Sequence, residues 1–505
     1  MLSKFVLAAG FFLLVSASLN AAVYRRYLPD RVITLDPLKT VERYSQFVAL
    51  QIYDPLFHLK DGTTPVPHLA ESYTYNSSTK SFRIQIRKDV FFHDGLQLKA
   101  ADILFSIQRM CRHNSGNAKV LPLIKGCRDG EKFGIQETGD FELSIQLHEH
   151  FPPFISYLAS PQFMILPNSF HGRKEEEFFK RPVGTGAFIL EHINNDEVSL
   201  KRNDRYFLGK SDLDGIVGLT EPQEKIYARL KDGSIDDIFP LPPPATYPSA
   251  YEEVRFNTAS SMLLTFRTGV EPFERAGIRK ALRASIRFDR LKTEYSSQGI
   301  VPGTGVVPWG AIGFDPAMPI FQHDRNIVRQ YLREAGYADV SLVPKIVVHV
   351  ALKEPLSRKI AELIESDFRE QGFKCLFAYH SLPELVQAIQ QNKAGVILFA
   401  PAISSIDTYQ FMEMWRSGSG SGLSPSDKEY DAVLDSALKS SDRVVRGEIY
   451  KKADRLLVEN AYTITLGHII SQRSLRKKGW TVPIVNILGP FLNPMYGTRL
   501  AGLKG

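Results

Sequence analysis

The sequence predicts an α/β protein with more than one structural unit, and three observations support this. A strand–helix–strand–helix–strand pattern spans residues 345–400, which implies a parallel sheet covered by helices. Alternating apolar and polar residues at 81–87 and 141–147 predict antiparallel strands, with a helix over 98–110 between them. The chain has 505 residues, and at roughly 150 residues per domain this length suggests several units.

The composition is that of a globular protein. Hydrophobic residues make up 44% and charged residues 23% of the chain, which are typical fractions. They exclude a disordered chain, a collagen-like fibre and a protein with many membrane spans. Lys and Arg number 62 against 55 Asp and Glu, a net charge of +7 without a dense basic run. Nucleic acid is therefore not an expected partner.

Residues 1–22 have the features of a cleaved secretory signal. Lys4 supplies a positive charge, residues 5–15 form an apolar run, and small residues follow up to Ala22. The run is too short for a comfortable membrane span. We expect cleavage after Ala21 or Ala22, and an uncleaved anchor is the alternative. No cysteine lies near the cleavage region, so no lipid attachment is expected.

The three cysteines are too few for a disulfide scaffold and lack the spacing of a zinc site. Cys111 and Cys127 flank a loop rich in Gly, Asn and Ser. In an oxidising compartment they could form a local disulfide, and the alternative is a pair of buried free thiols. Cys375 lies in an apolar run and is expected to be a core residue without a catalytic partner.

The middle of the chain alternates short strands and turns. Residues 182–240 contain short strands with Gly and Pro turns, and the Pro-rich stretch 240–248 cannot continue a helix or a central strand. A helix is expected to begin near Phe273. Closer to the C-terminus, 443–458 is expected to be a long helix and 463–470 a strand.

The βαβαβ pattern gives the first place to look for a site. The expected strands and helices are, in order, 345–352, 358–371, 373–379, 383–391 and 394–400. Ligands of parallel sheets bind beyond the carboxyl ends of the strands. The loop 401–416 leaves the third strand at that end, so we expect functional side chains there.

Several motifs occur together along most of the chain. Leu35-Asp36-Pro37 and Tyr53-Asp54-Pro55-Leu56 are followed by Phe92-His93-Asp94-Gly95, Ala101-Asp102-Ile103-Leu104-Phe105-Ser106, Pro182-Val183-Gly184-Thr185-Gly186 and Ile278-Arg279-Lys280-Ala281-Leu282. In these motifs the chain resembles the family 5 extracellular solute-binding proteins, the dipeptide, oligopeptide and nickel receptors of ABC importers.

The resemblance implies two lobes around a cleft, a periplasmic binding protein of the class II or cluster C type. Lobe I would have a core at 23–50, 181–258 and 480–505, with an extra α+β subdomain at 51–180. Lobe II would be 259–479. The lobes would close on a ligand by a hinge motion, and a membrane permease would recognise the closed state.

The resemblance also implies a function. The protein would be a monomeric periplasmic receptor that binds a peptide, a peptide-like molecule or another small solute and delivers it to the permease of an ABC importer. It would need no cofactor and perform no chemistry. The alternatives are a periplasmic sensor or scaffold on the same fold, and a receptor for a non-peptide solute such as a metal chelate or a sugar.

Two departures from the family pattern bear on the ligand. Pro401 stands where peptide-binding members carry an Asp that holds the ligand amino group, so either Asp407 reaches the site or the ligand has no such anchor. Arg267 stands where many relatives have Asn, and it could meet a ligand carboxylate or form a structural hinge pair. Further candidate ligand contacts are Tyr44, Trp309, Phe399, Tyr409, Trp415 and Arg416.

No motif predicts an enzyme or a metal centre. His148 and His150 share one face of an expected strand and form a possible metal pair, but the end of a surface strand is the favoured interpretation. His93 belongs to a family turn and is expected to be structural. No Gly-x-Ser-x-Gly elbow is present in the sequence. We therefore expect neither catalytic residues nor metal ligands.

Overall fold

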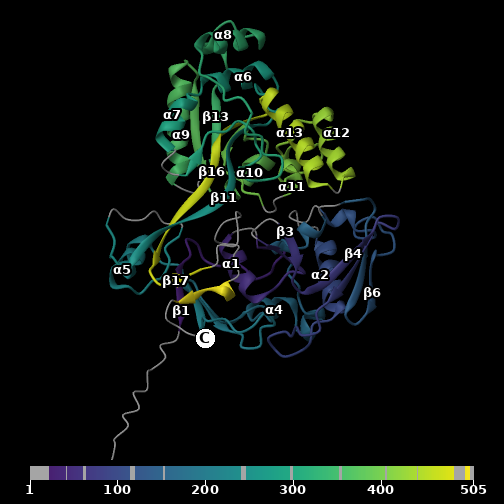
Figure 1. Cartoon of the computed structure of the whole chain (residues 1–505). Coiled ribbons are helices and arrows are strands. Elements are labelled where there is room, and N and C mark those ends of the chain that lie inside the picture. The colour runs from purple at the N-terminus through teal and green to yellow at the C-terminus, as the bar shows by residue number, and fades with distance from the viewer. Residues whose placement is uncertain are drawn as a thin grey trace, which may run out of the picture.

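The structure is a computed structural model that describes residues 22–40, 43–60, 64–113, 120–151, 154–239, 246–295, 299–351, 355–403, 407–440, 442–482 and 495–500. These residues form two lobes, with lobe I at the bottom and lobe II at the top of Figure 1. The expected α/β class and the two lobes are confirmed. The expected signal peptide lies outside the described residues, except for Ala22. None of the described helices combines the length and the apolar character needed to cross a membrane.

The core of lobe I contains β1 (Val23–Tyr27), α1 (Arg43–Ile52), α4 (Glu175–Lys180), β8 (Phe188–Ile193), β9 (Glu197–Arg202), β10 (Gly215–Leu219), α5 (Gln223–Asp232), β17 (Trp480–Thr481) and β18 (Arg499–Leu500). Four of these strands form a sheet with the order β1-β10-β9-β8. The sheet packs on α1, because Tyr24 and Phe188 share a hydrophobic cluster with Phe47 of the helix.

The extra α+β subdomain of lobe I contains β2 (Phe57–Lys60), β3 (Thr64–Pro67), β4 (Ala70–Asn76), β5 (Ser81–Ile86), α2 (Ala100–His113), β6 (Ile135–Gly139), β7 (Glu142–Gln146) and α3 (Phe154–Tyr157). Its main sheet is antiparallel, with the order β4-β5-β7-β6. Ile84 of β5 and Leu143 of β7 are buried against Ile103 and Ile107 of α2. The alternation in the sequence therefore predicted the buried face of this sheet.

Lobe II contains β11 (Tyr251–Phe266), α6 (Ala276–Ser285), α7 (Phe288–Tyr295), β12 (Ile300–Val301), α8 (Arg325–Glu334), β13 (Ile346–Ala351), α9 (Pro355–Glu370), β14 (Cys375–His380), α10 (Leu382–Gln390), β15 (Val396–Phe399), α11 (Tyr409–Met412), α12 (Lys428–Ser436), α13 (Arg443–Glu459) and β16 (Thr463–Lys477). Its sheet has the order β12-β16-β11-β15-β13-β14. β13 pairs in parallel with both β14 and β15, as the βαβαβ pattern predicted.

Two long strands connect the lobes. β11 and β16 run antiparallel from Tyr251↔Lys477 in lobe I to Thr265↔Thr463 in lobe II, and both views show them crossing from one lobe to the other. Their register shifts twice near the crossing, and such irregularities bend a ladder. Leu475 packs in a lobe I cluster with Tyr27 and Leu219. Lobe II therefore ends earlier along β16 than the expected boundary at 479.

Cys111, near the end of α2, and Cys127 are joined by a disulfide, with Cα atoms 5.3 Å apart. The bond closes a loop whose residues 114–119 lie outside the described part of the chain. The bond ties α2 to the turn around Cys127, and the chain continues from this turn to β6. Cys375 is free and buried within lobe II.

Removing this disulfide should destabilise the protein. A sequence separation of 16 residues corresponds to about 3 kcal/mol in the chain-entropy account. The double variant Cys111→Ser, Cys127→Ser is expected to unfold at correspondingly lower urea concentration than the oxidised wild-type protein. Wild-type protein with a reductant should behave like the variant. Equal midpoints for the oxidised and reduced wild type would contradict the prediction.

Candidate functional site

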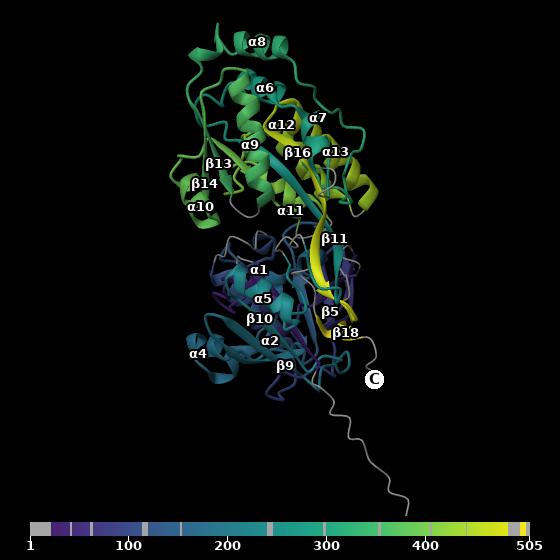
Figure 2. The same ribbon diagram turned by 90° about the vertical axis from the view of Figure 1, so that its left-hand side faces the viewer.

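A cavity of about 610 Å³ lies between the two lobes. From the subdomain of lobe I it is lined by Val120, Leu123, Glu149, His150, Phe151 and Tyr157, and from lobe II by Tyr409, Glu413, Arg416, Asp435, Leu438 and Lys439. α11, which begins at Tyr409, lies at the edge of lobe II that faces lobe I in both views (Figures 1 and 2). A molecule in this cavity would therefore touch both lobes at once.

Aromatic rings form the apolar wall of the cavity. Phe151 of lobe I meets Tyr409 of lobe II edge to face with ring centroids 5.8 Å apart, and it also contacts Tyr157 at 5.6 Å. Both tyrosines are buried. Burial first, and then the nearby Glu413, raises the pKa of Tyr157 and of Tyr409, so both phenols stay protonated near neutral pH. They present hydroxyl groups that can donate or accept hydrogen bonds.

The charged part of the cavity is dominated by carboxylates. Arg416 donates from Nε and Nη2 to the two oxygens of Asp435, each at 2.8 Å. This pairing raises the pKa of Arg416. Glu149, Glu413 and Lys439 complete the charged lining. Three carboxylates against two cations leave the lining with an excess of one negative charge when His150 is neutral, and this favours a ligand with a cationic group.

Asp407 is buried in lobe II and its carboxylate is already engaged. Oδ2 accepts hydrogen bonds from Nη2 and Nε of Arg446 at 2.7 and 3.0 Å, and Oδ1 accepts one from the Tyr450 hydroxyl at 2.6 Å. The side chain of Asp407 is 4% exposed. Asp407 is therefore not expected to anchor a ligand amine, because its charge is compensated by Arg446 inside lobe II.

Arg267 follows the end of β11 that is remote from lobe I. Its guanidinium donates to the carbonyl oxygens of Gly422 and Ala394 and to Oδ1 of Asn392. These contacts tie two loops of lobe II together. Arg267 is thus neither at the cavity nor at the crossing between the lobes, in contrast to both expectations for it.

Three further predicted residues lie in two places: Phe399 and Pro401 at the carboxyl end of β15, and Trp309 in the segment between β12 and α8. The Pro401 carbonyl accepts hydrogen bonds from Ser260 Oγ at 2.9 Å and from Ser261 N at 3.2 Å, which ties the end of β15 to the crossing strand β11. Phe399 packs between two hydrophobic clusters. Trp309 is 52% exposed and contacts Phe314. None of the three lines the cavity.

The remaining candidates divide between core and cavity. Trp415 is fully buried and packs against Phe411, so it is a core residue. Tyr44 packs in the core of lobe I, beside Phe239. Of the predicted ligand contacts, Tyr409 and Arg416 line the cavity. Tyr409 lies there because α11 is at the lobe edge, and its contact with a ligand stays a prediction.

Sequence reasoning missed the lobe I half of the cavity and four residues of its lobe II half, Glu413, Asp435, Leu438 and Lys439. Glu149, Phe151 and Tyr157 carry no motif that would single them out. Glu413 lies within the loop 401–416 and four residues after Tyr409, a spacing that places two side chains on the same face of a helical turn. The helical spacing was therefore a signal from which Glu413 could have been found.

Comparisons with known proteins agree on one family and one fold. A sequence model of the bacterial extracellular solute-binding proteins, family 5 (middle), matches residues 64–422. Heme-binding protein A of Haemophilus influenzae is 24% identical, over 90% of this chain and 87% of its own length. The glutathione-binding protein GsiB of Salmonella paratyphi A is 25% identical, over 89% and 90%.

Solved structures share the fold over nearly the whole chain. The periplasmic binding protein DppA of Helicobacter pylori, in complex with the peptide STSA, superposes with a TM-score of 0.81. The overlap covers 95% of this chain and 98% of that one, at 19% identity. At this level of identity the likeness establishes the two-lobed fold, and the ligand has to be argued from the chain's own residues.

Proposed function

Because the chain belongs to the bacterial extracellular solute-binding proteins of family 5, we propose that it is the receptor of an ABC importer. It binds a peptide or peptide-like molecule between its lobes and presents it to a membrane permease. The observation that carries the proposal is the interlobe cavity, to which both lobes contribute side chains. Its volume of about 610 Å³ lies in the usual range for small-molecule sites.

The fold suggests how binding is coupled to delivery. A ligand that contacts both lobes stabilises the closed arrangement relative to any open one, by the difference in its contacts. The crossing strands β11 and β16, with their two register shifts, are the elements that a hinge motion would bend. The residues lining the cavity include no Ser, Thr or Cys nucleophile, which fits reversible binding without chemical conversion.

The lining also suggests how a ligand amine is held. Pro401 has no carboxylate, and that of Asp407 is paired with Arg446. Glu413 lines the cavity together with Tyr157 and Tyr409, whose pKa values are raised first by burial and then by the charge of Glu413. We assign Glu413 as the partner of the cationic group of the ligand, with Phe151 and Tyr409 as the apolar contacts.

Ligand pools tested by thermal unfolding will check this function. Ligand that co-purifies is first removed by unfolding and refolding the protein. Dipeptides and oligopeptides are then compared with sugars and with nickel or chelated metals. A ligand at 100 times its Kd stabilises by about 2.7 kcal/mol, which is expected as a shift of a few degrees in Tm. Peptides should produce the shift.

Glu413→Gln should weaken the binding of a peptide with a free amino terminus by about tenfold or more, because a charge-assisted contact is lost. N-acetylated peptide should bind weakly to the wild-type protein, and its affinity for the variant should be the same. Glu362→Gln, on the exposed side of α9, is the matched control and should leave affinity unchanged. Tight binding of the acetylated peptide by the wild type would overturn the role of Glu413.

Partner and compartment belong to the same proposal. Export by the segment 1–22 would deliver a monomer to the periplasm, where the closed form would meet its permease. Nucleic acid is not a partner in this proposal. If no ligand pool shifts the Tm, the alternative function is favoured, a sensor or scaffold that signals to a protein partner.

A further inference from the structure

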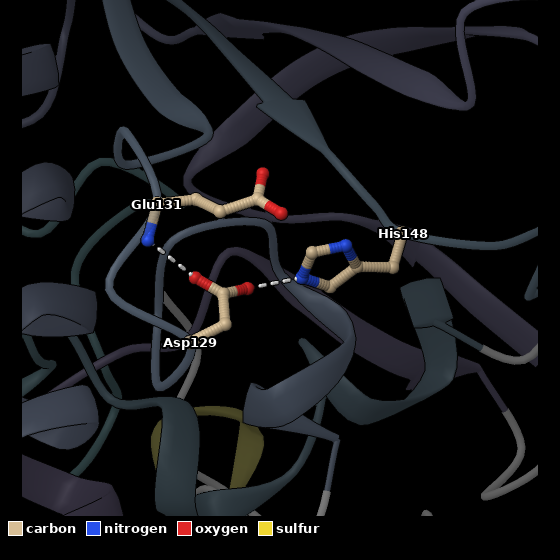
Figure 3. Close-up of side chains that lie close together, drawn as sticks. All are labelled: Asp129, Glu131 and His148. Carbon is tan, nitrogen blue, oxygen red and sulfur yellow. Dashed lines mark hydrogen bonds and ion pairs between the residues drawn. The ribbon is translucent and has the colours of Figure 1, made fainter.

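A second cluster of polar side chains lies on the surface of lobe I, outside the cavity. Figure 3 shows Asp129, Glu131 and His148 pointing toward one another from two chain segments. One ligand atom from each side chain lies within 4.8 Å of the other two. His148 Nε2 contacts one carboxylate oxygen of Asp129, so the imidazole is aimed into the cluster.

The two histidines of the strand end have separate partners. His150 Nδ1 is hydrogen-bonded to the Tyr75 hydroxyl at 2.8 Å, whereas His148 faces Asp129. The pair considered in the sequence therefore does not form. His148 instead meets two carboxylates from a turn about 17 to 19 residues earlier in the chain, a combination that no local pattern shows.

The backbone holds the cluster in place. Asp129 Oδ1 accepts a hydrogen bond from Glu131 N at 2.8 Å, and Oδ2 accepts one from Gly126 N at 3.2 Å. Lys125 N donates to Gln146 O and His148 N donates to Leu123 O, at 3.0 and 2.9 Å, so the turn is tied to the end of β7. The adjacent disulfide at Cys127 anchors the same turn.

We propose that Asp129, Glu131 and His148 bind a divalent transition-metal ion, with one imidazole nitrogen and two carboxylates as ligands. Zinc bonds such atoms at about 2.0–2.2 Å, so two ligand atoms on one tetrahedral ion lie about 3.4 Å apart. The three ligand atoms, now within 4.8 Å of one another, would have to move to that spacing by side-chain rotation when the ion binds. The imidazole selects Zn²⁺, Ni²⁺ or Cu²⁺ over Ca²⁺ and Mg²⁺, which prefer oxygen ligands alone.

The proposed metal site lies beside one wall of the interlobe cavity. Val120 and Leu123 precede the metal-binding turn, and Glu149 and Phe151 follow His148; all four line the cavity. A bound ion would cross-link these two segments directly beside that wall. The inference does not depend on the ligand proposed for the cavity, and it differs from the expectation that the protein has no metal ligands.

Calorimetric titration of the mature chain, after chelation, with ZnCl₂ tests the proposal. We expect one bound ion per chain and a higher Tm. His148→Gln should weaken zinc binding at least tenfold, and Asp129→Asn should weaken it as well. CaCl₂ and MgCl₂ should not bind at the same concentrations. His192→Gln is the matched control, because His192 is an exposed histidine paired with a single carboxylate, Glu197.

Copper provides a second measurement that folding defects do not imitate. Cu²⁺ bound at the site should show nitrogen hyperfine coupling in electron paramagnetic resonance, and His148→Gln should remove it while His192→Gln retains it. Absence of zinc binding by the wild type would overturn the proposal. So would a His148→Gln protein that binds zinc with wild-type affinity, since the ion would then lie elsewhere.

Discussion

Asp407→Ala is expected to lower the free energy of unfolding by about 3–5 kcal/mol, because it breaks a buried ion pair. Asp407 and Arg446 are both buried, and the carboxylate accepts from two guanidinium nitrogens and from the Tyr450 hydroxyl. Removing the carboxylate leaves the Arg446 charge inside lobe II without compensation. The Tyr450 hydroxyl loses its acceptor at the same time.

Urea denaturation of the ligand-free protein measures this loss, and ligand titration of the folded variant separates stability from binding. The ligand affinity should stay at the wild-type value, because the pair lies outside the cavity lining. The double variant Asp407→Leu, Arg446→Met should recover part of the stability, since it leaves no lone charge. A variant with wild-type stability but lost affinity would restore Asp407 as a ligand contact.

The fold was accessible from the sequence because its signals are local. The period-2 alternation at 81–87 and 141–147 gave β5 and β7 with their buried faces. The βαβαβ pattern gave β13, β14 and β15 and their parallel pairing. The lobe boundary on β16 was less accessible. The apolar run ends at Ile470 but the strand continues to Lys477, and tertiary contacts place its Leu475 in the lobe I cluster of Tyr27.

The candidate site could be predicted only in part from the sequence, because its charged side chains pair with residues far away in the sequence. Asp407 lies within the expected loop 401–416, but its partner Arg446 lies 39 residues later, on α13. Arg267 contacts carbonyl groups more than a hundred residues away. A sequence shows which acid or base is present, whereas these pairings decide whether it faces a ligand or another side chain.

The cavity shows the same limit in a second way. Its walls come from 120–157 and 409–439, segments that meet because β11 and β16 place the lobes against each other. Tyr409 was found from the loop after β15, but its partner Phe151 was not. The contact between them belongs to the arrangement of the lobes, which no single segment encodes.

Asp454 should make the protein less stable as the pH rises from about 4 to about 7. Its carboxyl is buried in α13 and accepts hydrogen bonds from Val306 N and Val307 N at 2.7 and 3.2 Å. Burial, with a smaller contribution from Asp315, raises its pKa from 3.8 to about 7. The folded state therefore favours the protonated form. The stabilisation it contributes is complete below pH 3.8 and is lost as the pH approaches 7, by up to about 4 kcal/mol.

Asp454→Asn isolates this effect from histidines that titrate in the same range with the opposite sign. Burial lowers the pKa of His58 to about 3 and of His468 to about 4. Since these imidazoles fold in the neutral form, they add stability as the pH rises. The difference in unfolding free energy between wild type and variant, measured by urea denaturation at a series of pH values, cancels their contribution. The variant should become more stable relative to the wild type as the pH rises toward 7. Parallel profiles would contradict the prediction, because they would mean that the pKa of Asp454 is the same in the folded and unfolded protein and that the two backbone N–H groups compensate its burial.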